Sequence, residues 1–190
     1  MNPRFAIVVA VAILAIAPAF ADDFGDGLAG IQNEWAIAKY QTPDKAARGA
    51  AFSALLKHAS EFSAQYPDRA EAFAWEGIVL STYAGEVSAM SAMKYAKAAR
   101  AALERAESLD ASALAGGVYA SLGALYSKVP GGLIGFGDDK RAAEYFHKAL
   151  AVDGDNIDNN FFYGEFLLDQ GDYAGARTVL EHALAAPAVA

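Results

Sequence analysis

Cysteine is absent from this 190-residue chain. The chain therefore forms no disulfide, has no thiolate nucleophile, and offers no cysteine to which a lipid anchor could be attached. A missing cysteine is compatible with an oxidising compartment as well as a reducing one. A chain of this length can bury a sizeable core without covalent cross-links, so we expect packing alone to hold the fold together.

Histidine is also scarce, and its three copies, His58, His147 and His182, do not have the spacing of metal-binding motifs such as H-E-x-x-H. The acidic stretch 153–160 lacks the glycine and the glutamate that an EF-hand calcium loop requires. No G-x-S-x-G elbow is present to hold a catalytic serine. We therefore predict no metal, no cofactor and no enzymatic activity.

Basic residues are fewer than acidic ones, 15 against 23, which gives a formal net charge of −8. No stripe of clustered Lys and Arg is visible along the chain. Nucleic-acid binding requires such clusters to neutralise phosphates, and adhesion to an anionic membrane requires them as well. The total charge thus predicts neither a nucleic-acid partner nor a membrane partner.

The only long apolar run lies at the N-terminus, from Phe5 to Ala17, after the single positive charge of Arg4. It is shorter than a membrane-spanning helix and ends at Pro18, before the small-residue pattern Ala19-Phe20-Ala21. This order is typical of a secretory signal peptide. We expect residues 1–21 to be cleaved and the remaining chain, 22–190, to be a soluble protein of the bacterial periplasm.

Beyond the signal, β-branched residues are sparse and alanine is abundant, which favours an all-α fold. Small and large residues recur with the offsets 4, 3 and 5 along four segments. They are Ala176-Leu180-Ala183-Ala188, Ala142-Phe146-Ala149-Gly154, Ala99-Leu103-Ala106-Ala111 and Leu55-Ala59-Phe62-Pro67. A recurring pattern of this kind predicts an array of similar helical units.

A second motif precedes each of the last three segments and places a glycine in the middle of a helix. Tyr119-x-x-Leu122-Gly123-x-x-Tyr126 parallels Asn160-x-x-Tyr163-Gly164-x-x-Leu167, and Phe73-x-x-Glu76-Gly77-x-x-Leu80 is a weaker copy. Glycine in a helix interior costs about 1 kcal/mol relative to alanine. We expect it to be retained where a neighbouring helix approaches closely, with alanines such as Ala106, Ala149 and Ala183 serving the same purpose on the partner helix.

Together the two motifs resemble the tetratricopeptide repeat, W-x2-L-G-x2-Y followed by A-x3-F and P. The resemblance covers most of the chain after the signal and implies a right-handed α-α superhelix of about four helix pairs. The units are about 22–67, 68–111, 112–154 and 155–188, of which the first matches poorly. Such pairs cannot bury their apolar faces alone, so they stack on one another.

The second and third units are longer than the last, and the extra residues fall between the two helices of each pair. In the second unit they read AGEVSAMSAMKYAK, which can lengthen both helices. In the third they include the glycine-rich stretch Val129–Asp139, where Pro130 ends one helix and Asp138 caps the next. In the polar turn between the third and fourth units we expect Asp155 or Asp158 to cap the helix that carries Phe161.

The glycine-rich stretch is not a phosphate-binding loop, because no strand precedes it and no Lys-Ser/Thr pair follows. Two interpretations remain open. Leu133, Ile134 and Phe136 either fold back onto the helices or contact a partner, since loops on rigid scaffolds often carry function.

The resemblance further implies that the first helix of each pair lines a concave surface. Phe161, Phe162 and Tyr163 are consecutive, and adjacent helix positions are about 100° apart, so at least one must leave the core. An exposed aromatic side chain there could anchor a partner. The candidate contacts on helices are Trp75, Ile78, Ser81, Ser121, Ser127, Lys128, Phe161, Phe162 and Glu165.

Two functions follow as expectations. The first is an exported scaffold, without catalytic activity, that binds a protein or peptide in the periplasm. The second rests on a resemblance to the T-component of TRAP transporters, a periplasmic tetratricopeptide protein that works with a solute-binding subunit. This chain departs from that family in lacking an acylated cysteine.

Overall fold

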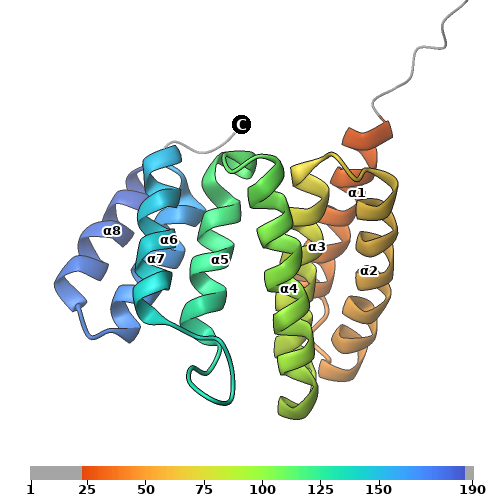
Figure 1. Cartoon of the computed structure of the whole chain (residues 1–190), viewed down its shortest axis with the longest axis horizontal. Coiled ribbons are helices and arrows are strands. Elements are labelled where there is room, and N and C mark those ends of the chain that lie inside the picture. The colour runs from red at the N-terminus through yellow and green to blue at the C-terminus, as the bar shows by residue number, and fades with distance from the viewer. Residues whose placement is uncertain (1–22, 187–190) are drawn as a thin grey trace, which may run out of the picture.

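The computed structural model describes residues 23–186, which form eight α-helices joined by short turns and no named strand (Figure 1). The predicted signal peptide, 1–21, lies outside the described residues. The elements are α1 (Asp23–Ala36), the π-helical turn η1 (Ile37–Gln41), α2 (Lys45–Gln65), α3 (Ala70–Glu86), α4 (Ala89–Leu109), the 3-10 turn η2 (Ala113–Gly116), α5 (Gly117–Lys128), α6 (Asp139–Val152), α7 (Ile157–Asp169) and α8 (Tyr173–Ala185).

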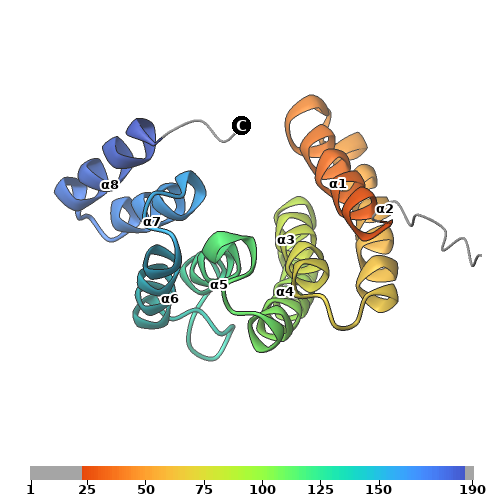
Figure 2. The same ribbon diagram turned by 90° about the horizontal axis from the view of Figure 1, so that it is seen from above.

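The helices form four consecutive pairs that follow an arc, so the chain is an α-solenoid (Figure 2). The first helices of the pairs, α1, α3, α5 and α7, lie on the inner side of the arc, and the second helices lie on its outer side. This arrangement confirms the predicted all-α superhelix. The second pair has the longest combined length, with 17 residues in α3 and 21 in α4, compared with 13 in each of α7 and α8.

A mid-helix glycine marks the close contact within each of the last three pairs. A Cβ atom added at Gly77 would lie 2.6 Å from Leu103, and one added at Gly164 would lie 2.6 Å from Leu180. At Gly123 the distance to Phe146 would be 2.9 Å. The large residue of the second helix therefore occupies the space that the glycine leaves, which confirms the reason predicted for these glycines.

The first pair achieves the same contact with a different register. A Cβ atom added at Gly27 of α1 would lie 2.6 Å from the ring of Phe62. In the later pairs the position of Phe62 is taken by alanine, and the large residue lies one turn earlier, where this pair has Ala59. Ile31, one turn after Gly27, is fully buried in the same cluster as Ala59.

Two hydrophobic clusters share the helix α3. Ala72 and Val79 belong to the cluster that α3 forms with α1 and α2, whereas Ala74 and Leu80 belong to the cluster that extends from α3 to α7. The faces of α3 thus join the first pair to the rest of the array. Nearest-neighbour packing of this kind is the basis of solenoid stability.

The turn between α4 and α5 has an unusual backbone. Leu114 and Ala115 have φ angles of 56° and 52°, and Gly116 follows with 89°. Side chains other than glycine rarely adopt this left-handed conformation. The fully buried Asn159 of α7 holds the turn, because its Nδ2 atom lies 2.9 Å from the carbonyl oxygen of Ala115.

The helix caps match one expectation and correct another. Asp138 caps α6 by accepting a hydrogen bond from the Arg141 N–H at 3.1 Å, as predicted. The prediction of Asp155 or Asp158 as the cap of α7 is wrong, since Asn156 accepts from the Asn159 N–H at 3.1 Å. Asp155 precedes the helix and contacts His182 instead, and Asp158 already lies in the first helical turn.

Candidate functional site

The exposed face of α7 carries three side chains at helical spacing. Phe161, Glu165 and Leu168 follow one another at intervals of four and three residues and therefore share one face. Phe161 remains 45% exposed on the inner helix of its pair, while Phe162 and Tyr163 pack against the main core. One aromatic side chain of the three thus leaves the core, as helical geometry requires.

Two candidate residues on α3 have different surroundings. Trp75 is partly buried, and its ring meets that of Trp35 edge to face at a centroid distance of 6.0 Å. The Trp35 indole N–H donates to the Thr82 hydroxyl at 3.0 Å. Trp75 therefore forms part of the packing between α1 and α3, whereas Ile78 stays partly exposed.

The candidates on α5 contribute less apolar surface to the inner side. Ser121 is partly exposed, and Lys128, at the end of the helix, forms an ion pair with Asp169 at the end of α7. This pair bridges neighbouring inner helices. The structure thus spreads the candidate contacts over three inner helices and places the largest exposed side chain on α7.

The glycine-rich stretch is an ordered loop whose two ends are held together. The Gly137 N–H donates to the Pro130 carbonyl at 3.0 Å, and the Asp138 N–H donates to the Tyr126 carbonyl at 3.0 Å. A Cβ atom at Gly137 would lie 1.8 Å from the Val129 carbonyl oxygen, so only glycine fits there. The loop is therefore closed at its base by backbone contacts.

The side chains of this loop divide between the two predicted interpretations. Phe136 folds back, with its ring 5.5 Å from that of Tyr126 and beneath the Arg100 guanidinium at 4.3 Å. Leu133 and Ile134 remain exposed at the tip. Phe136 thus anchors the loop, while Leu133 and Ile134 are available to a partner.

A cleft of about 490 Å³ lies between this loop and the second helix pair. Its walls are apolar, apart from Ser81 and Lys128. They consist of Ser81, Ala84, Gly85, Ala89, Ala92, Met93, Ala96, Leu125, Lys128, Val129, Pro130 and Ile134. Sequence reasoning missed the α4 side of this cleft, although the lengthened second unit was a signal that its turn projects beyond those of shorter pairs.

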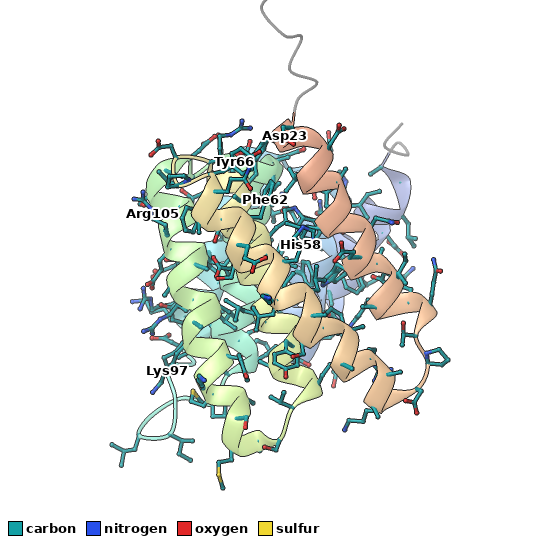
Figure 3. All side chains as sticks on the ribbon, turned by 90° about the vertical axis from the view of Figure 1, so that its right-hand side faces the viewer. Asp23, His58, Phe62, Tyr66, Lys97 and Arg105 are labelled. Atoms are coloured by element: carbon teal, nitrogen blue, oxygen red, sulfur yellow. The ribbon has the colours of Figure 1, made fainter. Side chains whose placement is uncertain are left out.

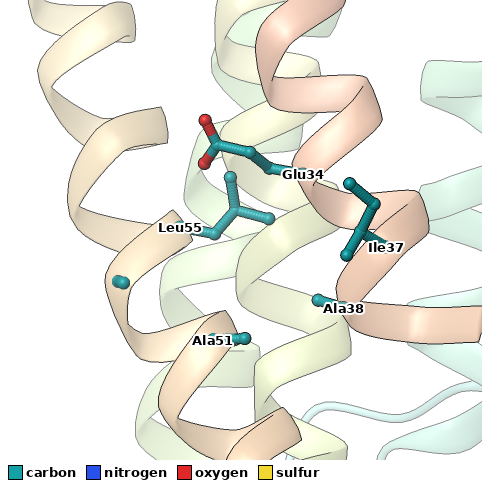
Figure 4. Close-up of a pocket in the computed structure, with 6 residues that line it drawn as sticks. Glu34, Ile37, Ala38, Ala51 and Leu55 are labelled. Atoms are coloured by element: carbon teal, nitrogen blue, oxygen red, sulfur yellow. The ribbon is translucent and has the colours of Figure 1, made fainter. Parts of the chain in front are cut away.

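A second hollow, of about 200 Å³, lies between α1 and α2 (Figure 4). Glu34, Ile37, Ala38, Ala51, Ala54 and Leu55 line it. It is less than half the size of the other cleft and carries one charged group. It offers no arrangement of several polar groups that would orient a ligand.

The titratable groups of the described chain serve packing and surface pairing. Burial, together with the charge of Glu107, raises the pKa of Tyr145 to about 12, and its ring stacks on Tyr126 at 5.6 Å. His58 and His182 contact Glu34 and Asp155, at 3.1 and 2.9 Å. Within residues 23–186 no three acidic or histidine side chains gather as they would around a metal ion.

Comparisons with known proteins agree with this architecture. The tetratricopeptide repeat family model matches residues 133–188, which include α6, α7 and α8. A thermophilic TPR protein of Thermus thermophilus, TTC0263, is similar to 86% of this chain and 91% of its own, with a TM-score of 0.61 and 14% identity. At this identity the similarity shows the fold alone.

The solved structure of MamA matches 84% of this chain and 88% of its own, with 18% identity and a TM-score of 0.49. A comparison with curated proteins gave no match.

None of the helices between residues 23 and 186 is both long and apolar enough to cross a membrane.

Proposed function

We propose that this chain of tetratricopeptide-like helix pairs is a non-catalytic, exported scaffold whose inner face binds a segment of a protein partner. The observation that carries the proposal is Phe161, a large aromatic side chain left 45% exposed on the inner helix α7. Exposed aromatic residues on rigid surfaces supply a large share of binding energy.

The neighbours of Phe161 suit a partner segment with both apolar and basic side chains. Its ring lies edge to face with that of Phe162 at 5.6 Å, which fixes its orientation before binding. Glu165 and Leu168 extend the same face by two helical turns. A segment with an apolar side chain next to a basic one complements this surface.

The proposal places the protein in the periplasm. Its support is the N-terminal order of one arginine, a short apolar run and the Ala19-Phe20-Ala21 pattern. Sequencing the N-terminus of the protein recovered from a periplasmic extract tests this part, and we expect it to begin at Asp22. An intact N-terminus in a membrane fraction would contradict it.

A photo-cross-linking amino acid at position 161 tests the partner surface. We expect a specific adduct with a periplasmic protein from position 161 and none from position 184, although Leu184 on the outer helix α8 is more exposed than Phe161. An excess of the protein without the cross-linking amino acid should compete for the partner and reduce the adduct. Phe161→Glu in this competitor should abolish the reduction, whereas Leu184→Glu should not. Equal adducts from both positions would reject the inner face as the binding surface.

The cleft beside the loop supports a second candidate function, the handling of a small apolar solute as in the T-component of TRAP transporters. Its volume of about 490 Å³ lies in the range of ligand pockets, and its walls are largely apolar. Ala92→Trp, at a partly exposed position in the wall, would fill the cleft and should abolish binding of an apolar fluorescent probe. If Phe161→Glu reduces probe binding and Ala92→Trp does not, this candidate fails.

A further inference from the structure

Exposed apolar side chains occur at the turn inside each of the four helix pairs. Tyr40 stands at the first such turn, Met90 at the second, Leu133 and Ile134 at the third, and Tyr173 at the fourth. All five are between 72% and 108% exposed. These turns lie at the lower end of the molecule in Figure 1, where the loop and the end of α4 project furthest.

The charges are distributed unequally between this end and the rest of the molecule. We name as the turn end the four intra-pair turns with the helix ends that flank them, residues 37–48, 84–97, 126–141 and 167–177. It contains nine Lys and Arg against six Asp and Glu. The remaining residues between 23 and 186 contain five Lys and Arg against sixteen Asp and Glu. The acidic total therefore conceals a basic end.

Most acidic groups of the turn end are already engaged. Asp44, Asp138 and Asp172 cap α2, α6 and α8, and Glu86 and Asp169 are paired with Arg48 and Lys128. Five lysines of this end take part in none of the ion pairs within the described chain. They are Lys39, Lys45, Lys94, Lys97 and Lys140.

We propose that the turn end docks on an anionic lipid surface, with the apolar tips at the level of the headgroups and the lysines against their negative charges. Apolar side chains beside basic ones are the pattern of proteins that bind the membrane interface. Tyrosine, present at the first and last turns, is enriched at that depth. The apolar tips belong to four separate turns, which a fluid bilayer can accept without matching pockets.

The distance between the turn end and the opposite helix ends explains why a negative total charge does not prevent binding to an anionic membrane. The helix α4 has 21 residues, which corresponds to about 30 Å. Acidic groups at the opposite helix ends, such as Asp68, Asp110 and Asp155, are thus separated from the membrane by about three Debye lengths at 0.1 M salt, and their repulsion is screened. The same polarity orients the molecule, because the acidic end faces away.

Figure 3 shows that the glycine-rich loop and the α3–α4 turn project together, with Lys97 above them and Arg105 toward the opposite end. The inner face around Phe161 is separate from these tips. Membrane docking is therefore independent of the proposed partner binding, and Phe161→Glu should leave it unchanged.

Flotation with lipid vesicles tests the proposal. The chain from Asp22 contains every described residue and lacks the apolar run 5–17, which would bind lipid by itself. We expect it to float with phosphatidylglycerol-containing vesicles at low salt, and much less with phosphatidylcholine alone or at high salt. Absence of binding to the anionic vesicles at low salt, or equal binding to both vesicles, would overturn the proposal.

Matched variants locate the contact. The double change Lys94→Glu and Lys97→Glu should weaken binding at least about tenfold, given the attraction expected per lysine. Leu133→Asp with Ile134→Asp should weaken it by about tenfold or more, because the tips lose their apolar contact. Lys57→Glu and Leu184→Asp, on surfaces away from the turn end, are the controls, and an equal loss in the controls would indicate non-specific adhesion and reject the proposal.

Insertion can be measured directly. A tryptophan introduced as Leu133→Trp should be quenched by lipids with brominated acyl chains, whereas Leu184→Trp should not add to the quenching of Trp35 and Trp75. Analytical ultracentrifugation without lipid provides the competing test. If the protein is a dimer that Leu133→Asp with Ile134→Asp converts to a monomer, the tips form an interface between copies and the proposal is wrong.

Discussion

The first helix pair and the three later pairs build the same contact from opposite registers. In the later pairs a mid-helix glycine faces a large residue, as Gly123 faces Phe146. In the first pair Gly27 faces Phe62, at a position that the other pairs fill with alanine. Close approach of two helices requires one small and one large partner, but it does not fix which turn of the helix supplies them.

The position of the first pair at the end of the array explains this freedom. Its outer surface does not have to match a preceding unit within the described chain, so its packing differs from that of internal units. Phe24 stacks on Phe62 at 5.2 Å, and the Arg69 guanidinium lies 3.6 Å above the Phe24 ring. An aromatic cluster thus lies where the first pair meets the start of α3, because Arg69 is the N-cap residue of that helix.

The largest expected effect separates the two kinds of pair. Phe146→Ala should destabilise the protein by about 3–5 kcal/mol, because a buried phenylalanine leaves a cavity. Phe62→Ala should lower the stability of the first pair by a similar amount. The first pair should then unfold separately from the other three, which gives a two-step urea transition. Tryptophan fluorescence and circular dichroism, followed together, measure both. A single shared transition for Phe62→Ala would mean that the first pair is as tightly coupled as the others.

A smaller effect concerns the glycines. Gly77→Ala places a methyl group 2.6 Å from Leu103 and should destabilise the fold by about 1–3 kcal/mol. Gly30→Ala, in the interior of α1 with nothing within 4 Å, should instead stabilise it by about 0.5–1 kcal/mol. Urea midpoints of the two variants give the signs. Equal signs would show that helix propensity, and not close packing, determines these positions.

The caps of the second helices differ among pairs by about 1 kcal/mol. Asp44, Asp138 and Asp172 each accept a backbone hydrogen bond, whereas Ser88 of α4 makes no side-chain cap bond. Asp138→Ala should therefore lower the free energy of unfolding by about 1 kcal/mol, and Ser88→Asp should raise it by up to about 1 kcal/mol. Thermal unfolding of both variants checks this, with Asp139→Ala as the neighbouring control, for which little change is expected.

The smallest effect tests the joint between the first and second pairs. Arg48 Nε lies 2.8 Å from Glu86 Oε1, and this hydrogen bond holds the pKa of Glu86 below its usual range. The stability that the carboxylate contributes is present above its unfolded pKa, about 4.3, and is lost as the pH falls through the folded pKa.

Glu86→Gln should lower stability at neutral pH by about 0.5–1 kcal/mol and flatten the decline below pH about 4. Urea unfolding measured across this pH range compares it with the wild type. The exposed pair Lys57–Glu61 supplies the control, because Glu61→Gln should change little. A decline as steep as in the wild type would assign the acid sensitivity to another carboxyl group.

Most of the fold was predictable because repeated packing leaves a repeated pattern. The offsets around Ala142 and Ala176, and the glycines Gly123 and Gly164, indicate helix pairs from the sequence alone. The cap of α7 was not predictable in the same way. Asp155, Asn156 and Asp158 are all good caps, and only the path of the turn places the Asn156 side chain at the Asn159 N–H.

The candidate contacts were predictable in part. Three consecutive aromatic residues cannot all enter one core, and Phe161 is the one that stays exposed. For the glycine-rich loop the sequence left two interpretations open, and each holds for some of its side chains. Phe136 turns inward and packs against Tyr126 and Arg100, whereas Leu133 and Ile134 remain exposed.

The sequence by itself determined the helices, their pairing and the location of the long turns, since these depend on periodicity and on residues close together in the chain. Only the tertiary structure decided what those turns share. Tyr40, Met90, Leu133 and Tyr173 are widely separated in sequence, and stacking of the pairs brings their turns to one end together with unpaired lysines. A net charge sums over the whole chain, whereas a partner meets one face, and stacking determines which charges that face carries.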